Sequence, residues 1–231
     1  MFFDEILVLG DSHARIFSNK KFKSFFPRYF FNVVKVAGAT VSGLKNPNPK
    51  TQALPIFMHG IKNSKAAITI ILIGEVDTGF VIWYRAEKHN TSITLALDKA
   101  IENYQKLIIE VSKKSRVICI STPLPTIQDG NNCGDVANAR NDVNATQLQR
   151  TELTVQFNKI MQKFCERNGY VYLSFDEESV GENGLVDPCL LNSDPTDHHY
   201  DMDKYADMII NKLNRSIDYG ALSDGNSAGF H

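Results

Sequence analysis

The sequence predicts an α/β fold: a three-layer sandwich in which helices cover both faces of a flavodoxin-like, mostly parallel sheet of about five strands. Short runs rich in β-branched residues are apolar on both faces, which is typical of strands buried on both faces of a parallel sheet. Segments with apolar residues every three or four positions lie between several of these runs, as crossover helices would. A chain of 231 residues, 43% of them hydrophobic, is sufficient for one such domain.

The predicted strands are short runs separated by helical or polar segments. In a flavodoxin-like strand order the first and third strands are neighbours, so the turns that follow these two strands face each other. The runs are Ile6–Leu9, Val33–Val36, Ala67–Ile73, Val117–Ile120 and Tyr170–Leu173.

The predicted helices show apolar residues on one face, repeated at the helical period. One begins after Ser92, one after Gln147, and one lies near the C-terminus. Their apolar positions are Ile93, Leu97, Ile101, Tyr104, Ile108 and Val111 in the first, Leu153, Phe157, Ile160 and Phe164 in the second, and Tyr205, Met208, Ile209 and Leu213 in the last.

Two connections, over residues 37–52 and 121–144, are rich in Gly, Pro and Asn and are long for a compact domain. Connections of this length favour a binding site or a lid. The final residues are small and polar. We therefore expect a single domain over residues 1–215 and a frayed polar tail over residues 216–231.

Composition argues against several classes of function. The formal net charge is −1 and no basic block is present, so nothing indicates a nucleic-acid partner. No apolar run approaches the roughly 20 residues that span a bilayer, and the N-terminus does not resemble a signal peptide, so we expect a cytoplasmic protein without a membrane span. The four cysteines form no C-x-x-C pair, which disfavours a thiolate zinc site. Neither G-x-G-x-x-G nor a P-loop follows a strand, so nucleotide binding is disfavoured.

The turn after the first predicted strand contains Gly10, Asp11, Ser12 and His13. Ligands of open parallel sheets bind at the carboxyl ends of the strands, where this turn lies. A glycine permits a sharp turn, and the helix start that follows offers free N–H groups, so Ser12 can act as a nucleophile if a base reaches it. Ordinary helix capping by Asp11 or Ser12 is the alternative interpretation. We expect His13 to face solvent or substrate.

A second polar cluster precedes the last helix, where His198 and His199 stand among the carboxylates of DPTDHHYDMD. A serine nucleophile needs a base such as histidine, and that histidine needs a carboxylate or carbonyl to set its tautomer. The cluster supplies both groups if it folds back over the strand ends, and it is otherwise a solvated cap on the helix. A metal site is disfavoured, because adjacent histidines seldom both face one ion and no second ligand cluster stands out.

Two further turns follow predicted strands. The sequence VAGATVSGL, residues 36–44, has glycines whose N–H groups can face an oxyanion. The sequence LIGEVDTG, residues 72–79, follows the third strand and faces Ser12 in the predicted strand order.

Together, the GDSH turn, the glycine after the second strand, the G-x-x-D turn after the third and the Asp/His cluster resemble the SGNH (GDSL-type) hydrolase superfamily. The similarity runs from Ile6 to Leu213, and its most specific parts are the GDS turn and the Asp/His cluster. GATVSGLKNPNPKTQALPIF, GEVDTGFVIWYRAEKH and PTDHHYD resemble a bacterial subgroup whose substrates are poorly defined. The resemblance implies the SGNH hydrolase fold and hydrolysis of an ester, with no metal or organic cofactor.

Carried over residue by residue, the resemblance makes Ser12 the nucleophile and His199 the base. The N–H groups of Ser12 and Gly38 would hold the oxyanion. Gly43 is the less favoured register for the glycine, and His198 is the alternative base.

The sequence departs from the family in two places. The third family block is usually G-x-N-D, with an asparagine that donates to the oxyanion, and the aligned residue here is Val76, whose side chain donates nothing. Loss of one such donor costs roughly 10²–10³ in rate. The family's aspartate usually lies three residues before its histidine, whereas Asp197 lies two before His199 and Asp194 lies five before it. Both carboxylates remain candidates, with Asp197 preferred.

The expected substrate contacts lie in and after the third turn: Asp77, Trp83 and Arg85. The segment FVIWYRAEKH, residues 80–89, is aromatic and basic, and aromatic faces stack on sugars and acyl groups. Simple packing of the lone Trp83 is the alternative.

We therefore expect an esterase that cleaves an O-acyl ester, on a carbohydrate or a small lipid, by a Ser-His-Asp mechanism. An O-acyltransferase that uses the same acyl-enzyme and a degenerate SGNH-like binding protein are the alternatives. His199 must be neutral to accept a proton, so activity should fall below an imidazole pKa of roughly 6 to 7. The acyl group, the alcohol and the oligomeric state leave no signal in the sequence.

Overall fold

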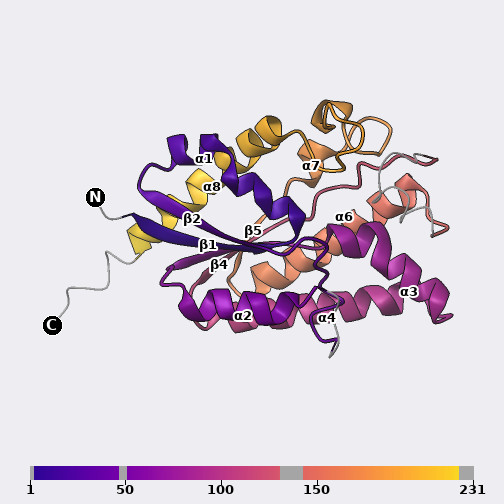
Figure 1. Ribbon diagram of the computed structural model, residues 1–231, viewed down its shortest axis with the longest axis horizontal. Coiled ribbons are helices and arrows are strands. Elements are labelled where there is room, and N and C mark those ends of the chain that lie inside the picture. The colour runs from indigo at the N-terminus through magenta and orange to yellow at the C-terminus, as the bar shows by residue number, and fades with distance from the viewer. Residues whose placement is uncertain (1–2, 47–50, 131–142, 224–231) are drawn as a thin grey trace.

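The computed structural model describes residues 3–46, 51–130 and 143–223, which form a five-stranded sheet between two layers of helices (Figure 1). The strand order is β2-β1-β3-β4-β5, and every pair of neighbouring strands is parallel. This confirms the predicted three-layer fold and its flavodoxin-like order. The strands are β1 (Asp4–Gly10), β2 (Tyr29–Lys35), β3 (Ile68–Leu72), β4 (Arg116–Ile120) and β5 (Val171–Leu173).

The helices divide between the two faces of the sheet. Helices α1 (Lys20–Phe25) and α8 (Met202–Ser223) lie on one face, and α2 (Ala53–Asn63), α4 (Ile93–Ser112) and α6 (Gln147–Arg167) cover the other (Figure 1). Shorter helical segments connect them: η1 (Ser12–Ser18), η2 (Asp77–Val81), α3 (Ile82–Lys88), α7 (Asp176–Ser179) and η3 (Pro188–Leu190).

Alternation along β1 explains why residues 6–9 of this strand are apolar on both faces. Leu7 and Leu9 join the core beneath α2, α4 and α6, whereas Ile6 and Val8 join the core beneath α8. Each of these four side chains is 1% exposed or less. A strand covered on both faces has no solvent side, so the hydrophobic effect favours apolar residues throughout.

Side-chain caps set the starts of the predicted long helices. Ser92 accepts a hydrogen bond at 3.1 Å from the N–H three residues later, and Thr146 and Gln149 form a reciprocal capping box at the start of α6. Asp201 accepts the N–H groups of Asp203 and Lys204 at the start of α8.

Helix α8 continues to Ser223, past the predicted domain boundary at residue 215. Ile217 is 3% exposed and belongs to the core, and Arg116 donates to the carbonyl oxygen of Ser216 at 2.8 Å. The first part of the expected tail is therefore helical, because its apolar side chain still reaches the sheet. Residues 131–142 of the second long connection and 224–231 of the expected tail lie outside the described residues. Among the helices that the structure does describe, none combines the length and apolar character needed to cross a membrane.

Candidate active site

The turn after β1 requires a glycine. A Cβ atom on Gly10 would lie 2.2 Å from the carbonyl oxygen of Leu72 and 2.8 Å from the Cβ of Ala14. The close approach of the β1 and β3 backbones at this point lets the chain turn directly into η1, which begins at Ser12. Ser12 therefore lies at the carboxyl edge of the sheet, half-buried.

Asp11 supplies the cap of η1 and leaves the Ser12 hydroxyl for another partner. Its buried carboxylate accepts the N–H of His13 at 2.9 Å and contacts Nδ1 of the same residue at 3.1 Å. Its other oxygen accepts the N–H of Gly74 at 3.3 Å, which ties the turn after β1 to the turn after β3. Asp11 therefore caps the helical segment, and the hydroxyl of the neighbouring Ser12 is not used for capping.

The Ser12 hydroxyl meets an imidazole from the far end of the chain. His199 Nε2 lies 2.9 Å from Ser12 Oγ, and His199 Nδ1 lies 2.5 Å from Asp197 Oδ1. The backbone N–H of His199 donates to the same carboxylate oxygen at 3.0 Å. With Nδ1 bound to a carboxylate, the lone pair of Nε2 faces the serine hydroxyl. Asp197, His199 and Ser12 therefore form one hydrogen-bonded series.

Asp197 is itself held by two side chains that sequence reasoning did not single out. Arg15 forms an ion pair with its second oxygen, and the amide of Asn192 donates to that oxygen at 3.1 Å. Burial opposes ionisation of Asp197, but the hydrogen bonds from Arg15 and His199 outweigh it and hold the pKa of this carboxyl well below its ordinary value. Arg15 lies one helical turn after Ser12, and this spacing was the feature of the sequence that could have indicated its place in the site.

The other candidates in this segment lie elsewhere. Asp194 is exposed and accepts the N–H and hydroxyl of Thr196, at 2.9 and 2.7 Å, so Asp197 and not Asp194 contacts His199. His198 is half-buried, and its carbonyl oxygen accepts the hydroxyl of Thr126 at 2.6 Å.

The connection after β4 holds the histidine segment in place. Besides the bond from Thr126, the N–H of Leu124 donates to the buried phenol of Tyr200 at 2.8 Å. Tyr200 also pairs with Leu191 in an isolated antiparallel bridge. These contacts fix the chain on either side of His199 over the strand ends.

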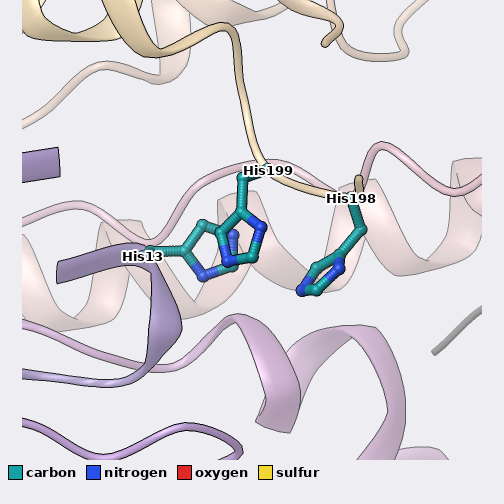
Figure 2. A group of neighbouring side chains, drawn as sticks. All are labelled: His13, His198 and His199. Carbon is teal, nitrogen blue, oxygen red and sulfur yellow. The ribbon is translucent and has the colours of Figure 1, made fainter. Parts of the chain in front are cut away.

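Three imidazoles gather at this point (Figure 2). The expectation that His13 faces solvent or substrate is wrong with respect to solvent: the residue is 4% exposed, and its ring centroid lies 4.4 Å from that of His199. The adjacent rings of His198 and His199 lie 4.1 Å apart and are tilted by 39°, so neighbours in sequence do face one region here. Burial, with the charges of His13 and His198, lowers the pKa of His199 to about 4 against the opposing effect of Asp197.

The loop after β2, residues 36–44 (the glycine loop), follows the carboxyl end of a strand parallel to β1. Gly38 has a φ of 69°, in the left-handed region that glycine tolerates. Within the described part of the chain, no protein atom accepts a hydrogen bond from the N–H of Ser12 or Gly38. The N–H of Gly43 donates to the hydroxyl of Thr40 at 2.9 Å, which leaves Gly38 as the glycine with an available donor.

Asp77 is not a substrate contact, because its side chain has no exposed surface. Its two oxygens accept the N–H groups of Val41 and Ser42 at 2.7 and 2.9 Å, so the carboxylate joins the turn after β3 to the loop after β2. Burial raises the pKa of Asp77 to about 6, despite those hydrogen bonds and the nearby Arg85.

Val76, Trp83 and Arg85 surround this junction. Val76 is half-buried and offers no side-chain donor. Trp83 packs partly against the core and donates to the carbonyl oxygen of Thr78 at 2.7 Å, while Arg85 donates to that of Ser42 at 3.3 Å. Both side chains brace the loops, and contact of their exposed parts with a substrate stays a prediction.

Comparison with known proteins gives a likeness in fold. No protein-family model matches the chain, and no curated protein matches it. Solved structures of lipases and esterases do match it over nearly its whole length, so the chain has the α/β fold seen in this class of acyl-ester hydrolases.

Three of these solved structures illustrate the likeness. A GDSL-like lipase from Bacteroides thetaiotaomicron is 14% identical, with a TM-score of 0.65 over 94% of this chain and 89% of that one. An extracellular lipase from Streptomyces rimosus is 13% identical, with a TM-score of 0.58 over 92% and 99%. An acetylxylan esterase from Geobacillus stearothermophilus, crystallised as a catalytic mutant, is 14% identical, with a TM-score of 0.57 over 94% and 95%. At these identities the likeness concerns the fold.

Proposed function

We propose that this protein is a serine ester hydrolase of the SGNH (GDSL-type) superfamily. The observation that carries the proposal is the series Asp197–His199–Ser12, whose contacts of 2.5 and 2.9 Å join a carboxylate, an imidazole and a hydroxyl at the carboxyl edge of the sheet. A base within hydrogen-bond reach of the nucleophile, oriented by a third group, is the arrangement that activates a serine.

The reaction follows from these contacts. Ser12 Oγ attacks the acyl carbon while its proton passes to His199 Nε2, and a tetrahedral intermediate forms. The protonated imidazole, stabilised by Asp197, returns this proton to the leaving alcohol as the carbon–oxygen bond breaks, which leaves an acyl-serine. Water then attacks the acyl-serine with His199 again as base, and the carboxylic acid and the free Ser12 hydroxyl are released.

The N–H groups of Ser12 and Gly38 are the proposed oxyanion donors. Neither N–H group donates a hydrogen bond to another atom in the described part of the chain, which supports this role. Val76 adds no side-chain donor, so we expect a slow hydrolase relative to enzymes with a complete set of donors. The proposed substrate is an O-acyl ester on a carbohydrate or a small lipid, a class that the esterase and lipase names of the structural neighbours support.

The test is labelling with a fluorophosphonate, which reacts covalently with activated serines, read by intact mass. We expect the native chain to gain one label and Ser12→Ala and His199→Ala to gain none. Ser18→Ala is the matched control, because Ser18 is an exposed serine of the same helix η1 and should leave labelling intact.

Turnover of a simple aryl acetate should accompany labelling, with a loss of at least about 10³-fold in Ser12→Ala. A folded native chain that neither labels nor turns over esters would overturn the proposal and favour the binding-protein alternative, which Val76 already suggests. Labelling with acyl transfer to an added sugar, in place of release to water, would identify an acyltransferase.

A further inference from the structure

Two of the three clustered histidines sit in the same short sequence pattern. Asp11-Ser12-His13 and Asp197-His198-His199 each place an aspartate two residues before a histidine. In both, one carboxylate oxygen accepts the backbone N–H of the histidine and contacts its Nδ1, at 3.1 Å in the first and 2.5 Å in the second. This contact assigns the proton to Nδ1 and the lone pair to Nε2 in each ring.

The cluster has dimensions suited to a metal ion. One ring nitrogen from each of His13, His198 and His199 lies within 4.8 Å of the other two (Figure 2). Three imidazoles that bind zinc at about 2.0–2.1 Å hold their nitrogens roughly 3.3 Å apart, so each nitrogen need move by only about 1 Å. His198 is the half-buried member and links the cluster to solvent.

The carboxylates behind two of the rings are themselves fixed. Asp11 also accepts the N–H of Gly74 at 3.3 Å, and Asp197 is held by Arg15 and by Asn192. Histidine ligands of metals commonly donate their other ring N–H to such a carboxylate, which fixes the ring and makes it a better ligand. Two of the three proposed ligands therefore have the supporting carboxylate that is common at metal sites.

We propose that His13, His198 and His199 bind one Zn²⁺ ion, or another divalent ion that prefers imidazole, and that this ion occupies the nitrogen of His199 that accepts the Ser12 hydroxyl. Nε2 has a single lone pair, so it can ligate the ion or accept the serine proton, and the two states exclude each other. The ion is thus an inhibitor. Binding rests on the histidine geometry alone, whereas inhibition rests on the proposed function.

Calorimetric titration of tag-free, chelator-treated protein with ZnCl₂ tests the binding. We expect one saturable site per chain, weakened by more than about 10-fold in His13→Ala and in His198→Ala. His89→Ala is the matched control, because His89 is an exposed histidine outside the cluster and its loss should leave binding unchanged. His198 is half-buried, so His198→Ala keeps the test decisive if His13→Ala does not fold, as judged by circular dichroism. No saturable binding, or unchanged binding in folded His198→Ala, overturns the site.

Ester hydrolysis in the presence of Zn²⁺ tests the exclusion. We expect the native rate to fall as the calorimetric site fills and to return when EDTA is added, while the rate of His198→Ala, relative to its own metal-free value, stays constant. A native rate that is unchanged or raised when the site is full overturns the exclusion. Fluorophosphonate labelling of the metal-free chain tests the hydrolase separately, and zinc binding to Ser12→Ala tests the site in a protein without the nucleophile, so failure of one is distinguishable from failure of the other.

Discussion

The two halves of the candidate site are built differently. On the side of the base, polar atoms converge on the Ser12 hydroxyl: His199 contacts it, Asp197 holds His199, and Arg15 and Asn192 hold Asp197. On the side of the oxyanion, the buried carboxylate of Asp77 takes two backbone N–H groups of the glycine loop, and the neighbouring position carries valine. The base half makes the contacts that the proposed mechanism needs, whereas the carboxylate of Asp77, in the proposed oxyanion half, joins two loops.

This contrast separates two requirements that a hydrolase must meet together. Proton transfer needs a few side chains in contact, and those are in place. Stabilisation of the transition state needs hydrogen-bond donors that the protein itself does not use. Of the N–H groups of Ser12, Gly38 and Gly43, only those of Ser12 and Gly38 have no acceptor within the described residues. Weak catalysis with a fully formed base is the expected consequence.

The largest effect should come from the base half. In Asp197→Asn the His199 tautomer is no longer set by a carboxylate, so we expect kcat/KM for an aryl acetate to fall by about 10²–10⁴. Asp194→Asn, three residues away and exposed, should stay within about 2-fold of the native rate. Equal losses in both variants would contradict the assignment of Asp197.

The second prediction concerns the oxyanion half, where a substitution of Val76 should raise the rate. Val76→Asn introduces the amide that the family usually carries, and we expect kcat to rise by up to about 10²-fold. Val76→Leu, which changes the side chain without adding a hydrogen-bond donor, is the control. An unchanged kcat in a folded Val76→Asn protein would show that the position does not face the developing oxyanion.

Removal of the Asp77 charge, which joins the two loops, should lower the stability of the fold more than it affects catalysis. Because burial raises the pKa of Asp77 only to about 6, the carboxylate is ionised at neutral pH, and Asn offers just one acceptor for two N–H donors. We expect Asp77→Asn to lower the free energy of unfolding by about 1–3 kcal/mol, measured in urea. Asp207→Asn, which removes an exposed carboxylate paired with Lys21, should change it by less than about 1 kcal/mol. Equal free energies of unfolding for the two variants would contradict the inference that Asp77 stabilises the junction of the two loops.

The smallest effect concerns pH. A base works only when neutral, so the rate is lost as pH falls through the pKa of His199, which burial and the neighbouring imidazoles lower to about 4. In buffer with EDTA, kcat/KM should therefore change by less than about 2-fold between pH 7 and 5, whereas an imidazole of ordinary pKa would lose most of its activity there. A midpoint near pH 6.5 would show that the lowered pKa does not govern catalysis.

Much of this was predictable from the sequence, for local reasons. Apolar runs and helical periodicity determine which segments become strands and helices, and the strand order then places the turns after β1 and β3 side by side. The two-residue spacing from Asp197 to His199 suffices for both hydrogen bonds, because backbone N–H and ring Nδ1 lie on the same side of a short turn.

The parts that sequence reasoning missed depend on contacts across the fold. Asp77 resembles a site carboxylate in its turn, and only the docking of the glycine loop onto it removes it from solvent. His13 follows the nucleophile directly, yet the segment from the far end of the chain covers it. The first part of the expected tail, residues 216–223, is helical because Ile217 packs into the core, which the polar residues around it do not indicate.

Ser12 and His199 are 187 positions apart in the chain. A nascent chain released up to residue 190 would have its sheet sequences complete and still lack the proton acceptor. Under the proposed mechanism, Ser12 would gain its proton acceptor only when the C-terminal segment docks. Recovery of fluorophosphonate labelling during refolding should accordingly report the docking of the C-terminal segment over the strand ends.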